Sequence, residues 1–189
     1  NWDYAQDMVG GDAAVYGNTC STTNSGISVI SNQNVVVFGN TLYGITGDGA
    51  LDAELSRNVV FDSNTLNGVT YPFMVYFSGA DITFSNNTAI LTNAAGAFRT
   101  NIAAATANLG EIRFTGNTVK ASSASQAQFP LGANKSWTIS GNTFHNVYWP
   151  GSNSTNGFVF TNNTLYYDAS PINWCVAVPT AASATPRTH

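Results

Sequence analysis

The sequence predicts an all-β fold, a parallel β-solenoid of about seven coils, and three observations lead to this prediction. The phrase Asn-Thr-apolar occurs seven times, and successive Asn residues of the phrase are 22, 24, 23, 30, 25 and 21 positions apart. A recurrence of twenty-odd residues is typical of solenoids, in which each repeat stacks on its neighbours. The residues before each Asn alternate in hydrophobicity with the two-residue period of a strand. A second strand-like segment follows most of the phrases.

The strand before each Asn is defined by two apolar columns, which lie five and three residues ahead of the Asn. These positions are two residues apart, so both side chains point to the same side of an extended strand. The position between them holds Arg113 in one coil and is therefore expected to face outward. Stacking in register would place Phe61, Phe84 and Phe114 above one another. The two columns are Ala13, Val35, Val59, Ile82, Ile112, Trp137 and Phe158, and Val15, Val37, Phe61, Phe84, Phe114, Ile139 and Phe160.

The Asn residues of the phrase are expected to form one stacked ladder at a turn. Each side-chain amide can donate a hydrogen bond to the coil on one side and accept one from the coil on the other side, which satisfies polar groups at a buried bend. The residue two positions after each Asn is apolar in every coil and is expected to begin the next inward-facing strand. The ladder residues are Asn18, Asn40, Asn64, Asn87, Asn117, Asn142 and Asn163.

The second strand-like segment is clear in the early coils and less regular later. In residues 49–55 we assign Leu51, Ala53 and Leu55 to the inward side, whereas either parity is open for residues 73–77. The clear segments are GISVI (26–30), GALDAEL (49–55) and FMVYF (73–77). The irregular ones are AQFPLG (127–132), YWPG (148–151) and INWCVAV (172–178).

Segments such as GALDAELSRNVVFDSNTLNG (49–68) resemble the right-handed parallel β-helix repeat of pectate-lyase-like proteins. The resemblance covers residues 12–178. It implies one right-handed β-helix domain over residues 1–178, with residues 1–11 as a candidate N-terminal cap, and residues 179–189 read as an irregular tail or linker. Members of this superfamily include polysaccharide lyases, glycoside hydrolases, sugar epimerases, phage tailspikes, adhesins and non-catalytic surface proteins, so the fold does not choose an activity.

The composition restricts the function. Charged residues make up 8% of the 189 residues, and the formal net charge is -4. Without a Lys/Arg cluster, nucleic-acid binding has no electrostatic basis, and the longest apolar run, residues 71–77, is too short to span a bilayer. Few charges with many Asn and Thr residues fit an extracellular, cell-surface or virion-surface protein. Candidate glycosylation acceptors are Asn86, Asn134, Asn153 and Asn162, although such triplets also arise by chance in this composition.

The two cysteines, Cys20 and Cys175, are expected in the first and last coils. They are then too far apart for an internal disulfide, whose Cα atoms must lie within about 7 Å of each other. Cys20 occupies an inward column and is expected to be a buried free thiol. The absence of a CxxC pair or a Cys/His cluster from the sequence argues against a zinc or iron–sulfur site.

The candidate catalytic residues are Asp52 and Glu54. They lie two positions apart on one strand, so both are expected to leave the outward face, with Cα atoms about 6.6 Å apart. Paired carboxylates suit glycoside hydrolysis or a Ca²⁺ site of the kind that lyases use to neutralise a uronate. The resemblance implies that active residues lie on such an outward strand face. The alternative is that both are solvated residues that keep this face soluble.

Other coils supply candidate substrate-binding residues, a mixture typical of sugar-binding grooves. The coil between Asn87 and Asn117 is the longest, and its extra stretch, residues 93–110, is interpreted either as a loop that lines a binding site or as a flap that packs over the rod. The isolated His145 is expected to be a surface or turn residue. The substrate-binding candidates are Asp48, Tyr76, Arg99, Gln128, Tyr148 and Trp149.

A column of Thr residues follows the Asn ladder and should face outward. Regular Thr arrays on β-solenoids occur in ice-binding proteins, but Thr is also a common first residue of a strand. The neighbouring column is interrupted by Phe38 and Asp62, which weakens the ice-binding interpretation. The column contains Thr19, Thr41, Thr65, Thr88, Thr118, Thr143 and Thr164.

Two main functions remain at this point. The first is a structural or adhesive module of a fibre, spike or surface layer that contacts polysaccharide and associates with itself or with a further part of a longer chain. The second is a polysaccharide lyase or glycoside hydrolase that uses Asp52 and Glu54. Sparse ionisable residues and the lack of an evident cap favour the first, and the carboxylate pair, the long coil and the aromatic residues favour the second.

Overall fold

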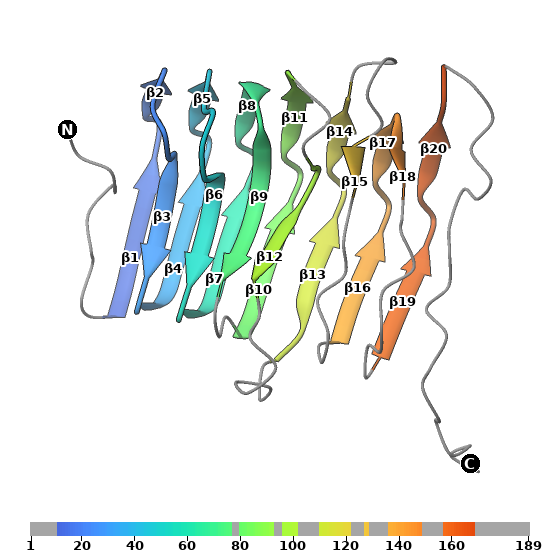
Figure 1. The fold of residues 1–189 in the computed structure, drawn as a ribbon. Helices are drawn as coiled ribbons and strands as arrows, with labels where there is room; N and C mark the ends of the chain where they lie inside the picture. The colour runs from blue at the N-terminus through green and yellow to red at the C-terminus, as the bar shows by residue number, and fades with distance from the viewer. Residues whose placement is uncertain are drawn as a thin grey trace, which may run out of the picture.

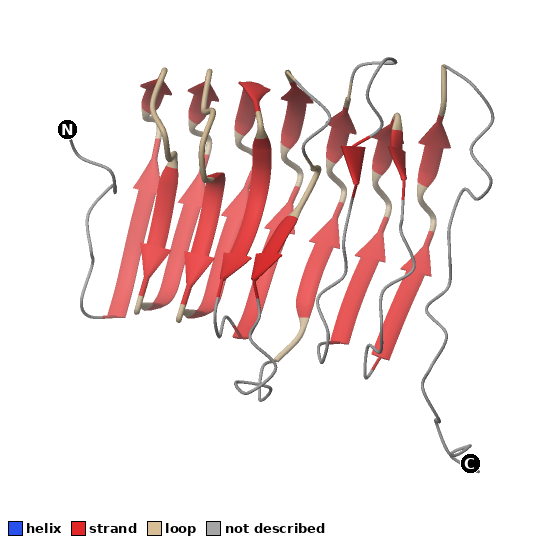
Figure 2. Cartoon of the chain, in the orientation of Figure 1, coloured by secondary structure: helices blue, strands red, loops and turns tan. Residues whose placement is uncertain are grey.

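The computed structural model describes residues 11–76, 80–92, 96–101, 110–121, 127–128, 136–148 and 157–168. These residues form β-strands and no helix (Figure 2). Every strand pairs in parallel with its neighbours, and the coils follow one another along one axis (Figure 1). In Figure 1 the coils advance from left to right, and the chain rises through the first sheet at the back and descends through the third sheet in front, which makes the coil right-handed. The predicted parallel β-helix is therefore confirmed. No helix capable of crossing a membrane occurs in this part of the chain.

The first sheet contains the seven strands that precede the ladder Asn residues, in coil order. They are β1 (Gly11–Tyr16), β4 (Gln33–Phe38), β7 (Arg57–Asp62), β10 (Ala80–Ser85), β13 (Ile112–Thr115), β16 (Ser136–Ser140) and β19 (Gly157–Thr161). The second sheet contains the seven strands that follow the ladder. They are β2 (Thr19–Ser21), β5 (Thr41–Tyr43), β8 (Thr65–Val69), β11 (Thr88–Leu91), β14 (Thr118–Lys120), β17 (Thr143–His145) and β20 (Thr164–Tyr166).

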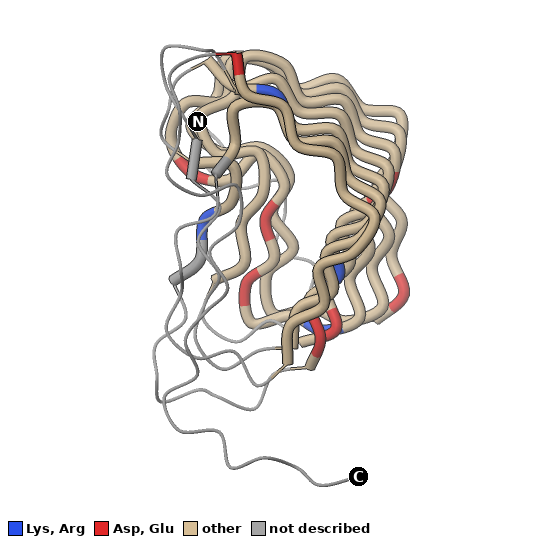
Figure 3. Tube along the Cα trace, turned by 90° about the vertical axis from the view of Figure 1, so that its right-hand side faces the viewer, with Lys and Arg blue, Asp and Glu red and all other residues tan. Residues whose placement is uncertain are grey.

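The third sheet is shorter than the other two. It contains β3 (Ile27–Ile30), β6 (Gly49–Glu54), β9 (Tyr71–Tyr76) and β12 (Arg99–Asn101). A separate pair in later coils consists of β15 (Ala127–Gln128) and β18 (Val147–Tyr148). The first and second sheets therefore contain seven strands each. The third sheet contains four strands, which belong to the first four coils. Figure 3, a view along the stack, shows the coils superimposed and only a few charged positions.

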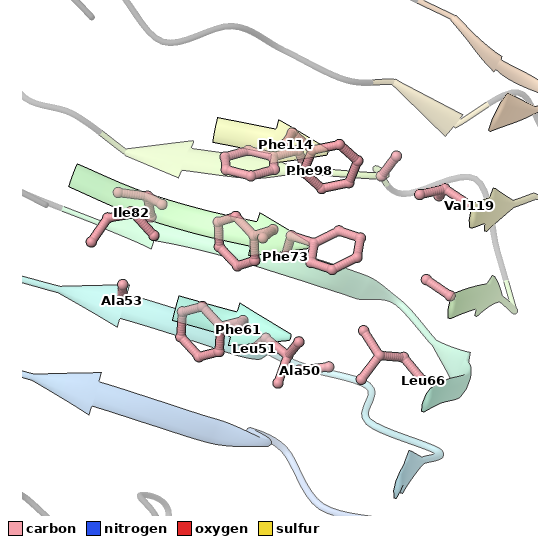
Figure 4. Packing of buried hydrophobic residues seen from close by; sticks show 14 of the residues in the cluster. Ala50, Leu51, Ala53, Phe61, Leu66, Phe73, Ile82, Phe98, Phe114 and Val119 are labelled. Carbon is pink, nitrogen blue, oxygen red and sulfur yellow. The ribbon is translucent and has the colours of Figure 1, made fainter. Parts of the chain in front are cut away.

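The inward columns form the core as predicted. Phe61 and Phe84 stack with ring centroids 4.9 Å apart and an interplanar angle of 7°, and the Phe84 and Phe114 rings are 6.1 Å apart and tilted by 47°. Phe73 reaches across from the third sheet and meets the Phe84 ring edge-on at 5.2 Å. Figure 4 shows Phe61, Phe73 and Phe114 of successive coils gathered between the sheets. Burial of such rings dominates the stability of a core.

The Asn ladder is present and has a direction. The backbone N–H and the Nδ2 of Asn64 both donate to Asn87 Oδ1, at 2.9 and 3.0 Å. Asn87 Nδ2 in turn donates to Asn117 Oδ1 and to the carbonyl of Phe61, each at 2.9 Å. The same donation to the following coil runs from Asn18 to Asn163. The five Asn residues between the ends are 1% exposed, so the ladder satisfies amides in a buried corner.

The corner that carries the ladder needs a left-handed backbone residue in every coil. The residue before each ladder Asn has a φ between 53° and 66°. Gly and Asn adopt this conformation at low cost, which explains why the column holds small residues. At Gly116 a Cβ would also lie 2.7 Å from Asn86 Oδ1. The column contains Gly17, Gly39, Ser63, Asn86, Gly116, Gly141 and Asn162.

The third sheet settles the open parity and corrects one assignment. Phe73 and Val75 are fully buried and in register with Leu51 and Ala53, so they point inward. The inward assignment of Leu55 was wrong, because β6 ends at Glu54 and Leu55 lies in the following turn, 51% exposed, with a φ of 49°. Side chains alternate between the two faces only within a strand, so the two-residue period predicted the wrong side for Leu55, which lies beyond the end of β6.

A smaller buried polar network lies at the corner between the third and first sheets. Ser56, 1% exposed, donates from Oγ to the Val29 carbonyl at 3.0 Å and accepts the backbone N–H of Asn32 at 3.0 Å. The sequence did not predict this network, because Asn32 and Ser56 are different residue types and so form no repeated column in the sequence. The candidate cap up to residue 10, segment 172–178 and tail 179–189 lie outside the described residues.

Candidate functional site

The outer face of the third sheet carries the residues that the sequence singled out. Two outward columns run across its strands in register. The first is Ser28, Asp52, Met74 and Arg99, and the second is Ile30, Glu54 and Tyr76. Three of the four coils therefore place a polar or aromatic candidate on one face.

Arg99 is the centre of a compact cluster on this face. Its Nη1 lies 3.0 Å from Asp48 Oδ1 in an ion pair, and its Nη2 donates to the Tyr76 hydroxyl at 3.4 Å. The guanidinium carbon lies 5.1 Å from the ring centroid of Tyr71 and 5.6 Å from that of Tyr76, within the range of cation–π attraction. We call Asp48, Tyr71, Tyr76 and Arg99 the Arg99 site. The Arg99 and Asp48 side chains are 35% and 45% exposed, so the site faces solvent.

The long coil positions Arg99 through two core residues. Ala97 and Phe98 are 0% and 1% exposed, and the Phe98 ring meets Phe84 and Trp137 edge-on at 5.6 and 5.1 Å. Strand β12 begins directly after this anchor and pairs with β9. The described part of stretch 93–110 thus packs over the core, as one of its two interpretations expected, and it also carries the centre of the Arg99 site.

Asp52 does not lie where the sequence predicted. It has the outward parity, but it is 1% exposed, and its column neighbours Ser28 and Met74 are also buried. The hypothesis that Asp52 is a solvated residue was therefore wrong, because the parity of a strand does not report whether its outer face is covered. Glu54 is half-buried. We call Asp52 and Glu54 the acid pair.

Burial raises the pKa of Asp52 to about 9. The charge of Glu54 and a hydrogen bond to it contribute to this raised pKa, and a hydrogen bond from Ser28 acts in the opposite direction. Asp52 therefore holds a proton at neutral pH, and its Oδ1 has no hydrogen-bond partner among the described residues. Glu54 is the member of the acid pair that solvent can reach. Within the described residues, no three His, Cys, Asp or Glu side chains converge in a group that could hold a metal ion, so Ca²⁺ stays a prediction.

The remaining binding candidates lie in later coils. The backbone pairs Gln128 with Tyr148 in the β15–β18 pair, beyond the third sheet, and Trp149 lies outside the described residues. The structure therefore brings together Asp48, Tyr76 and Arg99. It does not place Gln128, Tyr148 or Trp149 in this cluster. Sequence reasoning missed Tyr71 and Ser28. Ser28 could have been predicted, because it aligns with Asp52 when the segments 26–30 and 49–55 are stacked. Tyr71 could have been predicted only if the first residue of β9 had been known.

Other residues of interest lie on the second sheet or near its corner. His145 lies in strand β17 and is not isolated, because its Nε2 is 2.7 Å from Asp168 Oδ2, and its hydrogen bond is the main cause that lowers the pKa of Asp168. Cys20 is a free, half-buried thiol whose pKa is raised by burial. Asn86 and Asn162 are exposed at left-handed corners. The other cysteine and the other two candidate acceptors lie outside the described residues.

The Thr column stacks in register along the second sheet and faces outward, with Thr143 half-buried and the others exposed. The next outward column of the same sheet has side chains of very different size. It contains Ser21, Tyr43, Asn67, Ile90, Lys120, His145 and Tyr166. The Thr residues thus form one regular column, and the column beside it is irregular in side-chain size.

These features define the class of protein as a parallel β-helix with a polar and aromatic cluster on its third sheet. No protein-family model, no curated protein and no solved structure matches the chain.

Proposed function

We propose that this chain is a β-helix module of an extracellular, cell-surface or virion-surface fibre, spike or layer, and that it contacts polysaccharide through the Arg99 site. The observation that carries the proposal is the Arg99 guanidinium, which two tyrosine rings and the Asp48 carboxylate hold in place at a solvent-facing position.

The chemistry of the Arg99 site suits a sugar. A hexose offers hydroxyl groups that both donate and accept, together with apolar C–H faces. Asp48 accepts hydrogen bonds, Arg99 donates several in a fixed plane, and the tyrosines offer both ring surface and a hydroxyl. Because the ion pair and the ring contacts already order these side chains, binding requires little further loss of rotamer freedom.

The rest of the molecule supports a structural role for the module. Charged residues make up 8% of the chain, and backbone pairing between coils continues along the first two sheets. Such a rod presents one face at a fixed spacing, which is a useful property in an adhesive fibre.

The test is a binding panel of soluble neutral, amino-substituted and acidic polysaccharides, measured by calorimetry. The parent should bind at least one of them. Arg99→Met should weaken that binding at least tenfold, about 1.4 kcal/mol. Arg113→Met is the matched control, because Arg113 forms an ion pair with Glu111 on the first sheet at 2.5 Å. No binding by the parent, or an equal loss in both variants, would reject the proposal.

A second candidate function is cleavage of the bound polysaccharide by the acid pair, as in the lyases and hydrolases that the 49–68 segment resembles. The specific observation is the raised pKa of Asp52 beside Glu54, since a general acid must hold its proton at neutral pH. The assay is release of reducing ends or of unsaturated sugars from the polysaccharide that binds, with and without added Ca²⁺. Glu54→Gln should abolish release while binding persists, and unchanged release would exclude the acid pair.

A further inference from the structure

The Asn ladder has a free end of opposite kind at each end of the rod. Within the ladder, the backbone N–H and Nδ2 of each Asn donate to the Oδ1 of the Asn in the following coil. At the first coil, Asn18 Oδ1 accepts from no described residue, and at the last coil the Asn163 N–H donates to none. Asn18 is exposed and Asn163 half-buried, unlike the Asn residues between them. One end thus offers an acceptor and the other end a donor.

The backbone repeats this complementarity. The N–H of the Thr after each ladder Asn donates to the carbonyl of the ladder Asn in the preceding coil, for example Thr41 to Asn18 and Thr164 to Asn142, both at 2.8 Å. The Thr19 N–H has no such acceptor among the described residues, and the Asn163 carbonyl has no such donor. Among the described residues, the hydrogen bond that joins each coil to the next is therefore missing a donor at one end of the rod and an acceptor at the other.

The apolar side chains at the same two ends of the described core are only partly buried, and they differ in size. The apolar residues that are only partly buried against the core all belong to the first and last coils. Those of the first coil are small, and those of the last coil are large. They are Ala13, Val15 and Cys20, and Phe158, Phe160 and Leu165. A face of large side chains can pack onto a face of small ones without leaving voids.

We propose that the last coil docks onto the first coil of a second copy of this chain, in the register that the ladder prescribes. The Asn163 N–H and Nδ2 then donate to Asn18 Oδ1 of the next copy, and the Thr19 N–H of that copy donates to the Asn163 carbonyl. The contact joins two different surfaces and does not close on itself, so it propagates into a filament. Each copy adds roughly 34 Å, seven coils at about 4.8 Å each.

This inference supplies the partner for the fibre role proposed above, but it does not depend on polysaccharide binding. The Arg99 site lies on the outer face of the third sheet and stays accessible in the filament. Loss of binding in the Arg99→Met variant and loss of assembly are therefore separate outcomes.

Cysteine cross-linking tests the register. In a background with Cys20→Ala and Cys175→Ser, the register places Thr164 beside Thr19 of the next copy, with Cα atoms about 4.8 Å apart, within disulfide range. Thr19→Cys with Thr164→Cys should give a ladder of covalent dimers, trimers and longer species on non-reducing gels under mild oxidation. The matched control, Ser21→Cys with Thr164→Cys, is two residues out of register and should give at least about tenfold less dimer. Equal yields from the two pairs would overturn the register.

A proline at the edge tests the contact without touching the fold. Thr19→Pro removes an N–H that has no partner in the described residues, and proline is tolerated at the first residue of an edge strand. Light scattering of the parent and of Thr19→Val should show assembly that grows with concentration, and Thr19→Pro should stay monomeric with unchanged circular dichroism. A parent that is monomeric up to about millimolar concentration, where even weak association is populated, or a proline variant that assembles like the parent, would overturn the proposal.

Discussion

At the scale of the residue, buried polar side chains decide this structure as much as the apolar core does. Each inner ladder Asn makes several hydrogen bonds in a buried corner. The side chain of Asn87, for example, forms hydrogen bonds of 3.0 Å or less with four atoms of neighbouring residues. A leucine of similar size would fill the space but leave the neighbouring groups without partners. The cost of an unsatisfied buried group exceeds the value of an average hydrogen bond.

The first prediction concerns this ladder. Asn87→Leu should lower the free energy of unfolding by about 1–3 kcal/mol, because the buried Asn64 N–H loses its acceptor and the Phe61 carbonyl loses the Asn87 amide, while the Asn64 amide and the Asn117 Oδ1 each lose one of two partners. Urea denaturation followed by circular dichroism measures the loss. Thr88→Val, at the adjacent exposed position, should change stability by less than about 0.5 kcal/mol. Similar losses in the two variants would show that the ladder contributes little.

The second prediction concerns Asp52. Its pKa is about 9 in the folded state and 3.8 in its ordinary state, so unfolding releases a proton between these values and the parent loses stability as pH rises through this window. Asp52→Asn has no such proton. The stability of the variant relative to the parent should therefore increase with pH, by at most about 1.4 kcal/mol per pH unit.

Denaturation at pH 5, 6, 7 and 8 measures this trend, and Asp62→Asn is the control. Although burial raises the pKa of Asp62, hydrogen bonds from Ser85, Ser63 and Asn86 lower it overall. The contribution of Asp62 is thus present above its ordinary pKa and is lost as pH falls, so its variant should show no growing advantage above pH 5. A constant difference between parent and Asp52→Asn would mean that Asp52 is charged in the folded protein.

At the scale of the element, the corners determine where each strand begins and ends. Left-handed residues recur before the ladder in all seven coils and also appear where the third sheet turns into the first, at Ser31 and Leu55. A leucine in this conformation costs about 1–2 kcal/mol because its Cβ approaches a carbonyl oxygen. At 51% exposure, the Leu55 side chain recovers little of this cost through burial.

The third prediction follows from this turn. Leu55→Asn should stabilise the protein by about 0.5–1 kcal/mol, since Asn adopts a positive φ more readily than leucine. Leu55→Val, which is β-branched, should be less stable than the parent. Thermal unfolding of the three proteins gives the order of stability, and a valine variant as stable as the asparagine variant would contradict the account of the turn.

The same elements show how far the sequence could predict the structure. The Asn-Thr-apolar phrase determined the register of the first two sheets because each phrase is a short, local pattern that stacks on its own copies. The burial of Asp52 could not be predicted, because it depends on what covers the outer face of the third sheet. The contact between Asp48 and Arg99 joins residues 51 positions apart, and no repeat in the sequence links a loop residue of the second coil to strand β12.

At the scale of the whole molecule, stability is spread along the rod. Each coil contacts mainly the coils next to it, so stability is approximately a sum over coils and their interfaces. The end coils have one neighbour each and only partly buried core residues. The rod therefore combines two separable properties, a rigid face that carries the Arg99 site and two ends that fit each other.

The measurement that tests the central claim most directly is a crystal structure of the chain with an oligosaccharide from the polysaccharide that binds best. The account predicts a sugar ring packed against Tyr71 or Tyr76, with hydroxyl groups hydrogen-bonded to Arg99 and Asp48. A sugar bound on the first or second sheet, with the Arg99 site unchanged and empty at saturating ligand, would contradict it.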